Sequence, residues 1–424
     1  MSETTRQFES AFQSLVNDAQ WTPAWLKDLR QTSFEQFAQA GLPSRQIEAW
    51  KYTSTRSLNE SPFALGHASA IDAETLAARS VAGASRVVFI NGIFNAALSE
   101  LPTDVSITDI REALDTDREM VMPCMSAEDD SLVSLNQAFF SSGVLIKVNK
   151  NVTVAKPIQL LFLQDAQSET VLISPRNIIF VEAGAQAQII ESHFGDTKNF
   201  TNAVTDVFVK DNAVCQYVLE RVLGSETKYV SRHSFHLARD ARIETFNLAL
   251  GGRLNRSQLE FRLNAPGASA KLDGLYIARG DNHIDNVTEV LHLAPHTSSA
   301  QLYKGILEDK SRGVFNGKIT IVKDAQHVDA QQLNKNLLMS REAEVDSRPQ
   351  LIIDANDVKC SHGATIGQLD EQELFYLQSR AISLEDAKRM LAKAFIGDVV
   401  GRVSGNHFTK HLQDVLQSFG GGAQ

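Results

Sequence analysis

The chain has 424 residues, of which 43% are hydrophobic and 22% are charged, and its formal net charge is −10. This composition is typical of a folded globular protein, and the length predicts two or three domains rather than one core. The acidic balance, together with the absence of a basic tract, argues against nucleic acid as a partner.

Two helices are expected near the N-terminus. Apolar residues recur at helical spacing from Phe8 to Val16 and again from Trp25 to Phe37. The sequence Gly41-Leu42-Pro43 should end the second run, because glycine and proline punctuate helices.

A strand and a third helical segment are expected before residue 143. The apolar run Val87–Ile90 is followed by Asn91-Gly92, which predicts a strand and then a turn. After a loop that contains Pro123, a helix is expected over Ala127–Phe140.

From about Gly143 to residue 355 the chain alternates short apolar and polar stretches, separated by small or polar turns. Five stretches can be aligned at intervals of 28, 27, 26 and 30 residues, on Phe180, Phe208, Phe235, Phe261 and Leu291. A repeat of this length indicates a solenoid, whose units share one core. A sandwich or barrel is the alternative, but it would need hairpin turns every ~8–12 residues. The regular interval favours a parallel β-helix, with the helical first part covering one of its ends.

The residues after 366 return to helical patterns. Glu371–Gln378 is a short amphipathic segment, and Ser383 with Asp386 forms a capping box for the next helix. A last helix is expected from about Ser404 to Phe419. The middle helix carries an apolar stripe made of Ala387, Met390, Leu391, Ala394 and Phe395. Such a stripe is either the packing face of the helix or a contact surface for a partner.

Motifs of common enzyme classes are missing. The segment GVFNGK, Gly313–Lys318, has three residues between its glycines where a P-loop needs four, and Ile319 stands where Ser or Thr is required. There is no GxGxxG after a strand, no GxSxG and no HExxH. We therefore expect that this chain does not hydrolyse ATP itself. A carboxylate pair for glycoside hydrolysis could be formed by residues of different coils, and Asp273, Asp281 and Asp285 are candidates, but we interpret them as turn residues because Asp favours turns.

Cysteine usage and the first residues point to a reducing compartment. Cys124, Cys215 and Cys360 are far apart and odd in number, so they form no disulfide framework, and no CxxC pair is present. The N-terminal sequence MSETTRQFESAFQSLV lacks the basic and apolar regions of a signal peptide. No apolar run approaches the ~18 residues of a membrane span. We expect a cytoplasmic protein without membrane contact.

Three histidines, His283, His292 and His296, lie within 14 residues. On a strand, His283 and Asp285 would point to the same side, and a nearby carboxylate can orient an imidazole for metal binding. No ligand-spacing motif supports a metal there, and the alternative is a polar patch on one coil.

The segment KCSHGAT, Lys359–Thr365, places Cys360 and His362 two residues apart. The apolar run Leu351–Ile353 precedes it, and if that strand continues, both side chains face the same side, ~6.5–7 Å apart along the backbone. Two ligands cannot hold a cluster or a structural zinc, which need about four. If the pair is functional, the other ligands must come from elsewhere, for instance from another chain. Otherwise Cys360 is an inert buried thiol, as buried cysteines usually are.

Four segments are similar to one known family. DVKCSHGATIGQLDEQELFYLQSRAI (residues 357–382) resembles the C-terminal signature of SufD proteins, subunits of the bacterial SUF iron–sulfur cluster assembly machinery. GLPSRQIEAWKYT (41–53) resembles the N-terminal motif GLPTRxxExWKYT, and FNGKITI (315–321) and QLNKNLLMSREAEVDSRPQLII (332–353) also match. The resemblance covers essentially the whole chain. SufB proteins share the β-helix but lack CSHGA at this place.

The resemblance implies a mainly β fold, with a right-handed parallel β-helix core over residues 143–366. An N-terminal helical or mixed domain would cover residues 1–142, and a C-terminal helical domain residues 367–424. It implies a scaffold of the SufBC2D type without independent enzyme activity. Such a chain pairs with SufB through the β-helix and binds SufC, an ABC-type ATPase that would hydrolyse ATP, through the C-terminal helices. An isolated chain could also pair with itself.

The resemblance also assigns site residues. His362 matches a family histidine that ligates a transient iron–sulfur cluster at the SufB interface, and Cys360 matches its neighbour, to which we give less weight. Reduced flavin is associated with the whole assembly, but this chain has no flavin motif, and we expect no tightly bound cofactor in the isolated chain. The SufC contact would involve Phe375, Tyr376, Leu377, Arg380, Ala387, Met390, Leu391 and Phe395.

Two other functions are compatible with a parallel β-helix. A polysaccharide lyase or similar carbohydrate-active β-helix would show a groove of acidic and basic residues, calcium and usually secretion. A homodimeric structural protein would use the same β-helix face on a second copy of itself. The sequence favours the cluster-assembly scaffold.

Overall fold

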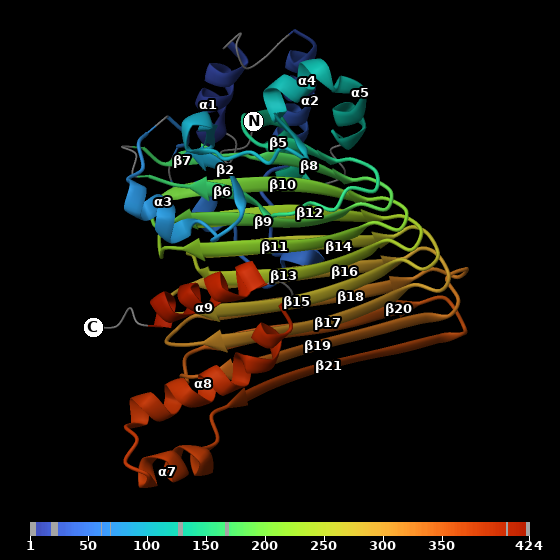
Figure 1. Cartoon of the computed structure of the whole chain (residues 1–424). Coiled ribbons are helices and arrows are strands. Elements are labelled where there is room, and N and C mark those ends of the chain that lie inside the picture. Colours follow the sequence, from blue (N-terminus) through green and yellow to red (C-terminus); the bar gives the residue numbers. More distant parts are fainter. Residues whose placement is uncertain are drawn as a thin grey trace.

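The structure is a computed structural model, which describes residues 6–17, 24–60, 62–67, 69–125, 130–165, 169–403 and 406–420. The chain winds between two sheets, which are parallel except where short strands close their first end (Figure 1). Successive long strands belong alternately to one sheet and the other. The fold is therefore a parallel β-solenoid with helices at both ends of the chain, which confirms the predicted fold class.

Within the described residues, one sheet has eleven strands and the other has ten. The eleven-stranded sheet contains β1 (Ala64–Leu65), β4 (Ser106–Asp109), β5 (Val144–Val148), β7 (Val171–Ile173), β8 (Arg176–Val181), β10 (Asn199–Val209), β12 (Lys228–Leu237), β14 (Leu254–Leu263), β16 (His283–His292), β18 (Arg312–Ile321) and β20 (Glu344–Ile353). The ten-stranded sheet contains β2 (Ser85–Ile90), β3 (Ile93–Phe94), β6 (Ile158–Leu163), β9 (Gln186–Gly195), β11 (Val214–Leu223), β13 (Arg242–Gly251), β15 (Ser269–Ala278), β17 (Ser298–Leu307), β19 (Val328–Leu338) and β21 (Val358–Gln368).

The α-helices lie before and after the long strands. They are α1 (Arg6–Asn17), α2 (Ala24–Ala40), α3 (Ala73–Arg79), α4 (Ile110–Thr116), α5 (Arg118–Val121), α6 (Ser131–Phe139), α7 (Glu371–Ser379), α8 (Leu384–Gly401) and α9 (Asn406–Gly420). Short 3₁₀ turns cover Glu48–Trp50, Arg56–Asn59, Ala96–Leu98 and Met122–Cys124. Among the helices of the described ranges, none combines the length and apolar character that crossing a bilayer requires.

Local signals in the sequence locate most of these helices. α2 ends before Gly41, whose φ of +72° is easily reached by glycine. The Ser383 hydroxyl accepts a hydrogen bond from the amide of Asp386 at 3.0 Å, which confirms the predicted cap of α8. The parts of two predicted helices at residues 127–129 and at Ser404 lie outside the described residues.

The predicted repeat is real, but its register differs by one residue at two of the five anchors. Phe180 lies opposite Phe208, with ring centroids 4.8 Å apart, and Phe235 lies opposite Phe261 at 4.6 Å. However, the strand partner of Phe208 is His236, and that of Phe261 is Val290. Both faces of these strands are largely buried, so apolar residues do not show which face points inward.

The turns between coils also stack. Asn212, Asp240 and Gly267 occupy equivalent positions with φ of 57°, 55° and 78°, a conformation that Asn, Asp and Gly tolerate best. The amide of Asn212 donates to the carbonyl of Arg239 at 2.9 Å, and that of Asp240 to Pro266 at 3.1 Å. Backbone hydrogen bonds thus continue around the corners of the solenoid.

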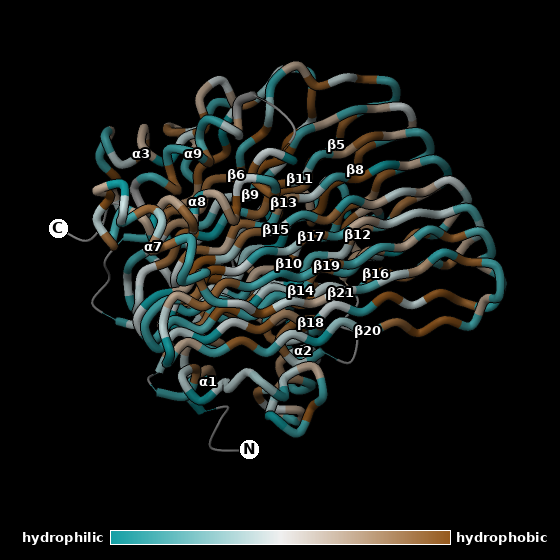
Figure 2. The backbone as a smooth tube through the Cα atoms, turned by 90° about the horizontal axis from the view of Figure 1, so that it is seen from below, coloured by the Kyte–Doolittle hydropathy of each residue, from teal (hydrophilic) through white to brown (hydrophobic). Residues whose placement is uncertain are grey.

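The main core fills the space between the two sheets, and apolar and polar stretches alternate along the strands (Figure 2). α1, α2 and α6 pack on the outer face of the eleven-stranded sheet, whereas α8 and α9 pack on the outer face of the ten-stranded sheet. α2, α4 and α5 also cover the first long strands, β5 and β8. β2 pairs in parallel with β6, so the region before residue 143 also contributes a strand to the solenoid.

Candidate functional site

Cys360 and His362 lie together on β21, the last strand of the ten-stranded sheet. The strand that contains Leu351–Ile353 does not continue to this pair, because that run ends β20 in the other sheet. A turn at residues 354–357 separates the two strands. The pair nevertheless occupies one face of one strand, since the residues are two positions apart.

That face points toward the inside of the solenoid. Cys360 pairs in register with Ala330 and packs against the main core. His362 pairs with Gln332, which lies next to Gln301 in the same row, and the Gln332 amide donates to the Gln301 carbonyl oxygen at 2.9 Å. Both glutamines are at most 5% exposed, whereas His362 is exposed. His362 is therefore the open end of an otherwise buried interior row.

The end of the solenoid is an edge in both sheets. In the described chain, β20 and β21 each pair with one neighbour only, β18 and β19 respectively. The side chains of both strands are mostly exposed or half-buried, unlike those of β17, which are mostly buried. Unpaired N–H and C=O groups at such an edge can form hydrogen bonds with a strand of another chain.

The three cysteines differ in their access to solvent and in their acidity. Burial raises the pKa of the Cys124 thiol to about 11 and that of the fully buried Cys215 to about 12. Partial burial, followed by the charge of Asp329, also raises the pKa of Cys360. At neutral pH the Cys360 thiol therefore keeps its proton and is a weaker ligand than a thiolate.

The histidine cluster predicted from sequence does not converge. His292 is buried, with Nδ1 2.8 Å from the hydroxyl of Thr297 and Nε2 3.0 Å from that of Ser299. His296 lies in a turn and stacks on His327 at 4.8 Å. Within the described ranges, no group of three His, Cys, Asp or Glu side chains is placed to hold a metal ion.

His283 and Asp285 do face the same side of β16, as expected, but they contact Thr53. The Thr53 hydroxyl lies 2.9 Å from His283 Nε2 and 2.5 Å from Asp285 Oδ2. Asp285 also forms an ion pair with Arg256. The turn interpretation of Asp285 is wrong, since it is a strand residue, while Asp281 does lie in a turn.

A buried polar cluster around Glu191 was missed by sequence reasoning. The Glu191 carboxylate lies 2.8 Å from His193 Nε2 and 3.4 Å from His233 Nε2, and it accepts hydrogen bonds from Thr205 and Tyr217. Burial acts to raise its pKa, but His233 and His193 outweigh this effect and hold the pKa well below its usual range. The segment QIIESHF alternates apolar and polar residues. This alternation would predict polar side chains inside the solenoid only if the inward face of the strand were already known.

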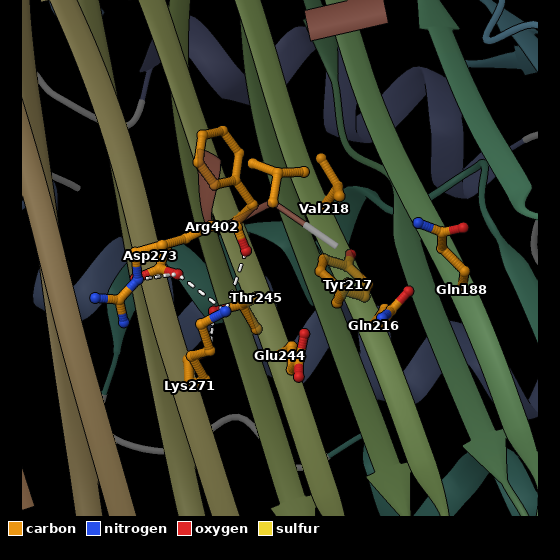
Figure 3. A pocket seen from close by; sticks show the side chains of 11 residues that line it. Gln188, Gln216, Tyr217, Val218, Glu244, Thr245, Lys271, Asp273 and Arg402 are labelled. Atoms are coloured by element: carbon orange, nitrogen blue, oxygen red, sulfur yellow. Dashed lines mark hydrogen bonds and ion pairs between the residues drawn. The ribbon is translucent and has the colours of Figure 1, made fainter. Parts of the chain in front are cut away.

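A small pocket lies between the outer face of the ten-stranded sheet and the connection from α8 to α9 (Figure 3). Asp273 Oδ2 is 3.1 Å from Arg402 Nε and 3.5 Å from Lys271 Nζ, and Lys271 also donates to the Arg402 carbonyl at 3.1 Å. Asp273 is a residue of β15, so its interpretation as a turn residue is wrong. The single carboxylate of Asp273 thus pairs with two cations, and these contacts tie the end of α8 to β15.

The predicted partner surface on α7 and α8 is only partly accessible. Phe375 is 74% exposed, Tyr376 57% and Met390 50%, and Arg380 stacks on Tyr376 at 5.4 Å. Ala387 is fully buried and contributes to packing within the chain. The residues with intermediate burial are Leu377, Leu391 and Phe395.

Comparison with known proteins identifies the relatives of this chain. Residues 162–395 match the family model of the SufBD core domain of the SUF iron–sulfur cluster assembly system, and residues 3–160 match that of the SufBD N-terminal region. The chain is 32% identical to the iron–sulfur cluster assembly protein SufD of Escherichia coli over 380 residues, 87% of each chain. It is 24% identical to SufD of Bacillus subtilis over 412 residues, which cover 93% of this chain and 94% of that protein. A SufBD family protein of Synechocystis is 28% identical over 398 residues, 89% of this chain and 87% of that protein.

Proposed function

Because this chain belongs to the SufBD family of the SUF iron–sulfur cluster assembly system, we propose that it is a non-catalytic scaffold subunit on which a cluster forms between partner chains. The observation that carries this proposal is the free end of the solenoid. There, in the part of the chain that the structure describes, two strands that pair on one side only flank interior rows that end in Cys360 and His362. The ligand set is incomplete in one chain, as expected for a site shared with another.

The partner at this end would be a SufB chain. A second β-solenoid can add strands to β20 and β21 and can cover the interior rows that end there. Pairing would bury His362 next to ligands from SufB and exclude water from the nascent cluster. An isolated chain would use the same edges to pair with a second copy of itself.

His362 would bind iron through a neutral imidazole, so cluster loading requires that nitrogen to be free of a proton. Cys360 would contribute less, because its raised pKa keeps the thiol protonated until a metal displaces the proton. The cluster is cargo that leaves for an acceptor protein. The chain's own contribution is to place the two side chains at the edge of the β21 strand.

SufC, an ABC-type ATPase, would dock on the exposed apolar side chains of α7 and α8. Figure 1 shows α7 beyond the edge of β21, clear of both sheets. Because α8 is anchored to β15 and β17, a movement imposed on α8 by the ATPase would be transmitted to the solenoid near its free end. ATP use would then alter the SufB interface. These roles imply a cytoplasmic assembly.

The decisive experiment replaces His362 with Ala in the chain co-expressed with SufB and SufC. We expect the three-chain complex to form, with iron and sulfide per complex reduced to a small fraction of the wild-type content. A Cys360→Ser variant should have a smaller effect. The measurement is iron and acid-labile sulfide in the complex isolated by size exclusion.

The control is His327→Ala, which removes another exposed histidine near the same end without changing an interior row. Its complex should load like the wild type. Normal loading of an intact His362→Ala complex would contradict the ligand role, and failure of the wild-type chain to co-purify with SufB would contradict the pairing.

A further inference from the structure

The N-terminal motif GLPSRQIEAWKYT has no place in the cluster site, yet it leads into a segment that crosses several coils of the solenoid. Residues 48–60, which we call the brace, run over the outer face of the eleven-stranded sheet. At one end, Glu60 pairs with Arg253 at 2.6 Å and with Lys228 of β12 at 3.6 Å. At the other end, Glu48 pairs with Arg348 of β20. The brace therefore links an inner coil to the edge strand.

The middle of the brace is held by a buried cluster of charges on β14 and β16. Arg256 is 1% exposed, and its guanidinium lies over the Trp50 ring at 3.9 Å and donates to the carbonyl of Ala49 at 3.0 Å. The same guanidinium pairs with Asp285, which also accepts a hydrogen bond from the Thr53 hydroxyl. A guanidinium that is paired, stacked and hydrogen-bonded in this way gives a rigid anchor.

His283 completes the anchor. Burial lowers its pKa to about 4, so the ring is neutral at physiological pH. The Thr53 hydroxyl proton is directed to Asp285, and His283 Nε2 at 2.9 Å is then the donor to the Thr53 oxygen. Trp50 and Thr53 are at most 7% exposed. Because Glu48 lies only two residues before Trp50, the anchor also fixes the position of the Glu48 backbone.

The Glu48 end of the brace contacts β20, which lies at the edge of its sheet. Among the described residues, β20 pairs its backbone with β18 only, and two of its side chains also contact β18. Asp346 pairs with Arg312 at 2.6 Å, and Gln350 donates to Asn316 at 3.0 Å. The Glu48–Arg348 pair instead ties β20 to a segment 300 residues away in sequence.

We propose that the brace positions β20 for pairing with a partner strand, and that Glu48 and Arg348 are its positioning residues. The statement about the partner rests on the proposed function, in which β20 is one of the two strands that pair with SufB. The effect of the brace on β20 itself does not depend on any partner. The two parts can therefore be tested separately.

The first test is hydrogen–deuterium exchange of the isolated full chain. Glu48→Ala should accelerate exchange in peptides that cover β20 by about two- to fivefold, the range expected for an exposed ion pair. Peptides of β14 and β16 should not change. The matched control is Glu100→Ala, which breaks another exposed pair, Arg86–Glu100 at 2.5 Å, far from the free end. It should leave β20 unchanged.

The second test measures binding of purified SufB. Glu48→Arg should weaken binding by about two- to tenfold through repulsion of Arg348, and the exchanged pair Glu48→Arg with Arg348→Glu should restore it. Unchanged exchange in β20, or faster exchange without weaker binding, would overturn the proposal. If the wild-type chain itself does not bind SufB, the proposed function fails, and the exchange data alone then decide whether the brace holds β20.

Discussion

At the scale of single residues, the interior of the solenoid contains polar groups whose contacts are specific. Glu191, at 0% exposure, contacts two imidazoles and two hydroxyl groups. A buried carboxylate costs free energy unless such partners compensate it. The cluster therefore stabilises the fold only while every member is present.

We predict that Glu191→Gln lowers the free energy of unfolding by about 3 kcal/mol, because an amide cannot replace the charge that His233 and His193 face. The control is Glu289→Gln on the outer face, where the carboxylate is half-buried and pairs with Lys318 at 2.6 Å, and a loss of about 1 kcal/mol or less is expected. The midpoint of urea denaturation measures both. Equal shifts for the two variants would show that the interior cluster has no special role.

The pair Cys360–His362 shows how much of a site a residue pattern can predict. The two-residue spacing on a strand places both side chains on one face, and this part needed no tertiary information. The register with Ala330 and Gln332 shows two further things. This face is the interior one, and the interior rows end at Cys360 and His362. No local signal distinguishes the last coil of a solenoid from an inner coil.

At the scale of elements, α8 shows that one amphipathic pattern can serve two purposes. Of the predicted stripe, Ala387 is buried and Leu391 and Phe395 are half-buried, whereas Met390 and Ala394 are exposed. The contact face is displaced toward Ile396 and Val399, which pack on the ten-stranded sheet. The exposed surface of α8 continues onto α7, whose side chains are all at least partly exposed.

We predict that the double substitution Phe375→Asp and Tyr376→Asp weakens binding of SufC by at least about tenfold, since exposed aromatic side chains commonly dominate interface energies. The fold should be unaffected, because neither side chain is buried. Biolayer interferometry with immobilised SufC gives the affinity. Leu101→Asp is the control, because Leu101 is 49% exposed but lies in the N-terminal region. SufC binding that survives the double substitution would place the docking surface elsewhere.

At the scale of the whole molecule, buried neutral histidines make stability depend on pH. Burial lowers the pKa of His283 and of His292 to about 4, and it also lowers that of His193. In the unfolded chain these groups titrate near 6.5, so between pH 6.5 and 4 the unfolded state binds more protons. Stability must therefore fall as the pH decreases through this window.

His411 acts in the opposite direction. Burial tends to lower its pKa, but the hydrogen bond and charge of Glu220, with Asp414, raise it above the usual value. Its stabilising contribution is complete below pH 6.5 and is lost as the pH rises through the raised pKa. It therefore cannot cause a loss of stability on acidification.

We predict that the melting temperature decreases steadily from pH 6.5 to 4.5 and that His292→Gln reduces this dependence. For His292 alone the full effect is on the order of 3 kcal/mol when both titrations are complete. Differential scanning fluorimetry measures the melting temperatures of the variant and of the wild type at each pH in this range. A His292→Gln profile parallel to that of the wild type would mean that this ring does not resist protonation in the fold.

The sequence by itself determined the repeat, the change from helices to strands and back, the cap of α8 and the common face of Cys360 and His362. The cap and the common face are local, because they depend on residues a few positions apart in one element, and the repeat is visible directly as a recurring spacing along the chain. The tertiary structure decided the register of the coils, the inward face of each strand, the free end at β20 and β21 and the contact of Glu48 with Arg348. Both faces of most strands are covered, so the pattern of apolar residues is the same for either register. Contacts between segments 300 residues apart exist only once the coils are stacked.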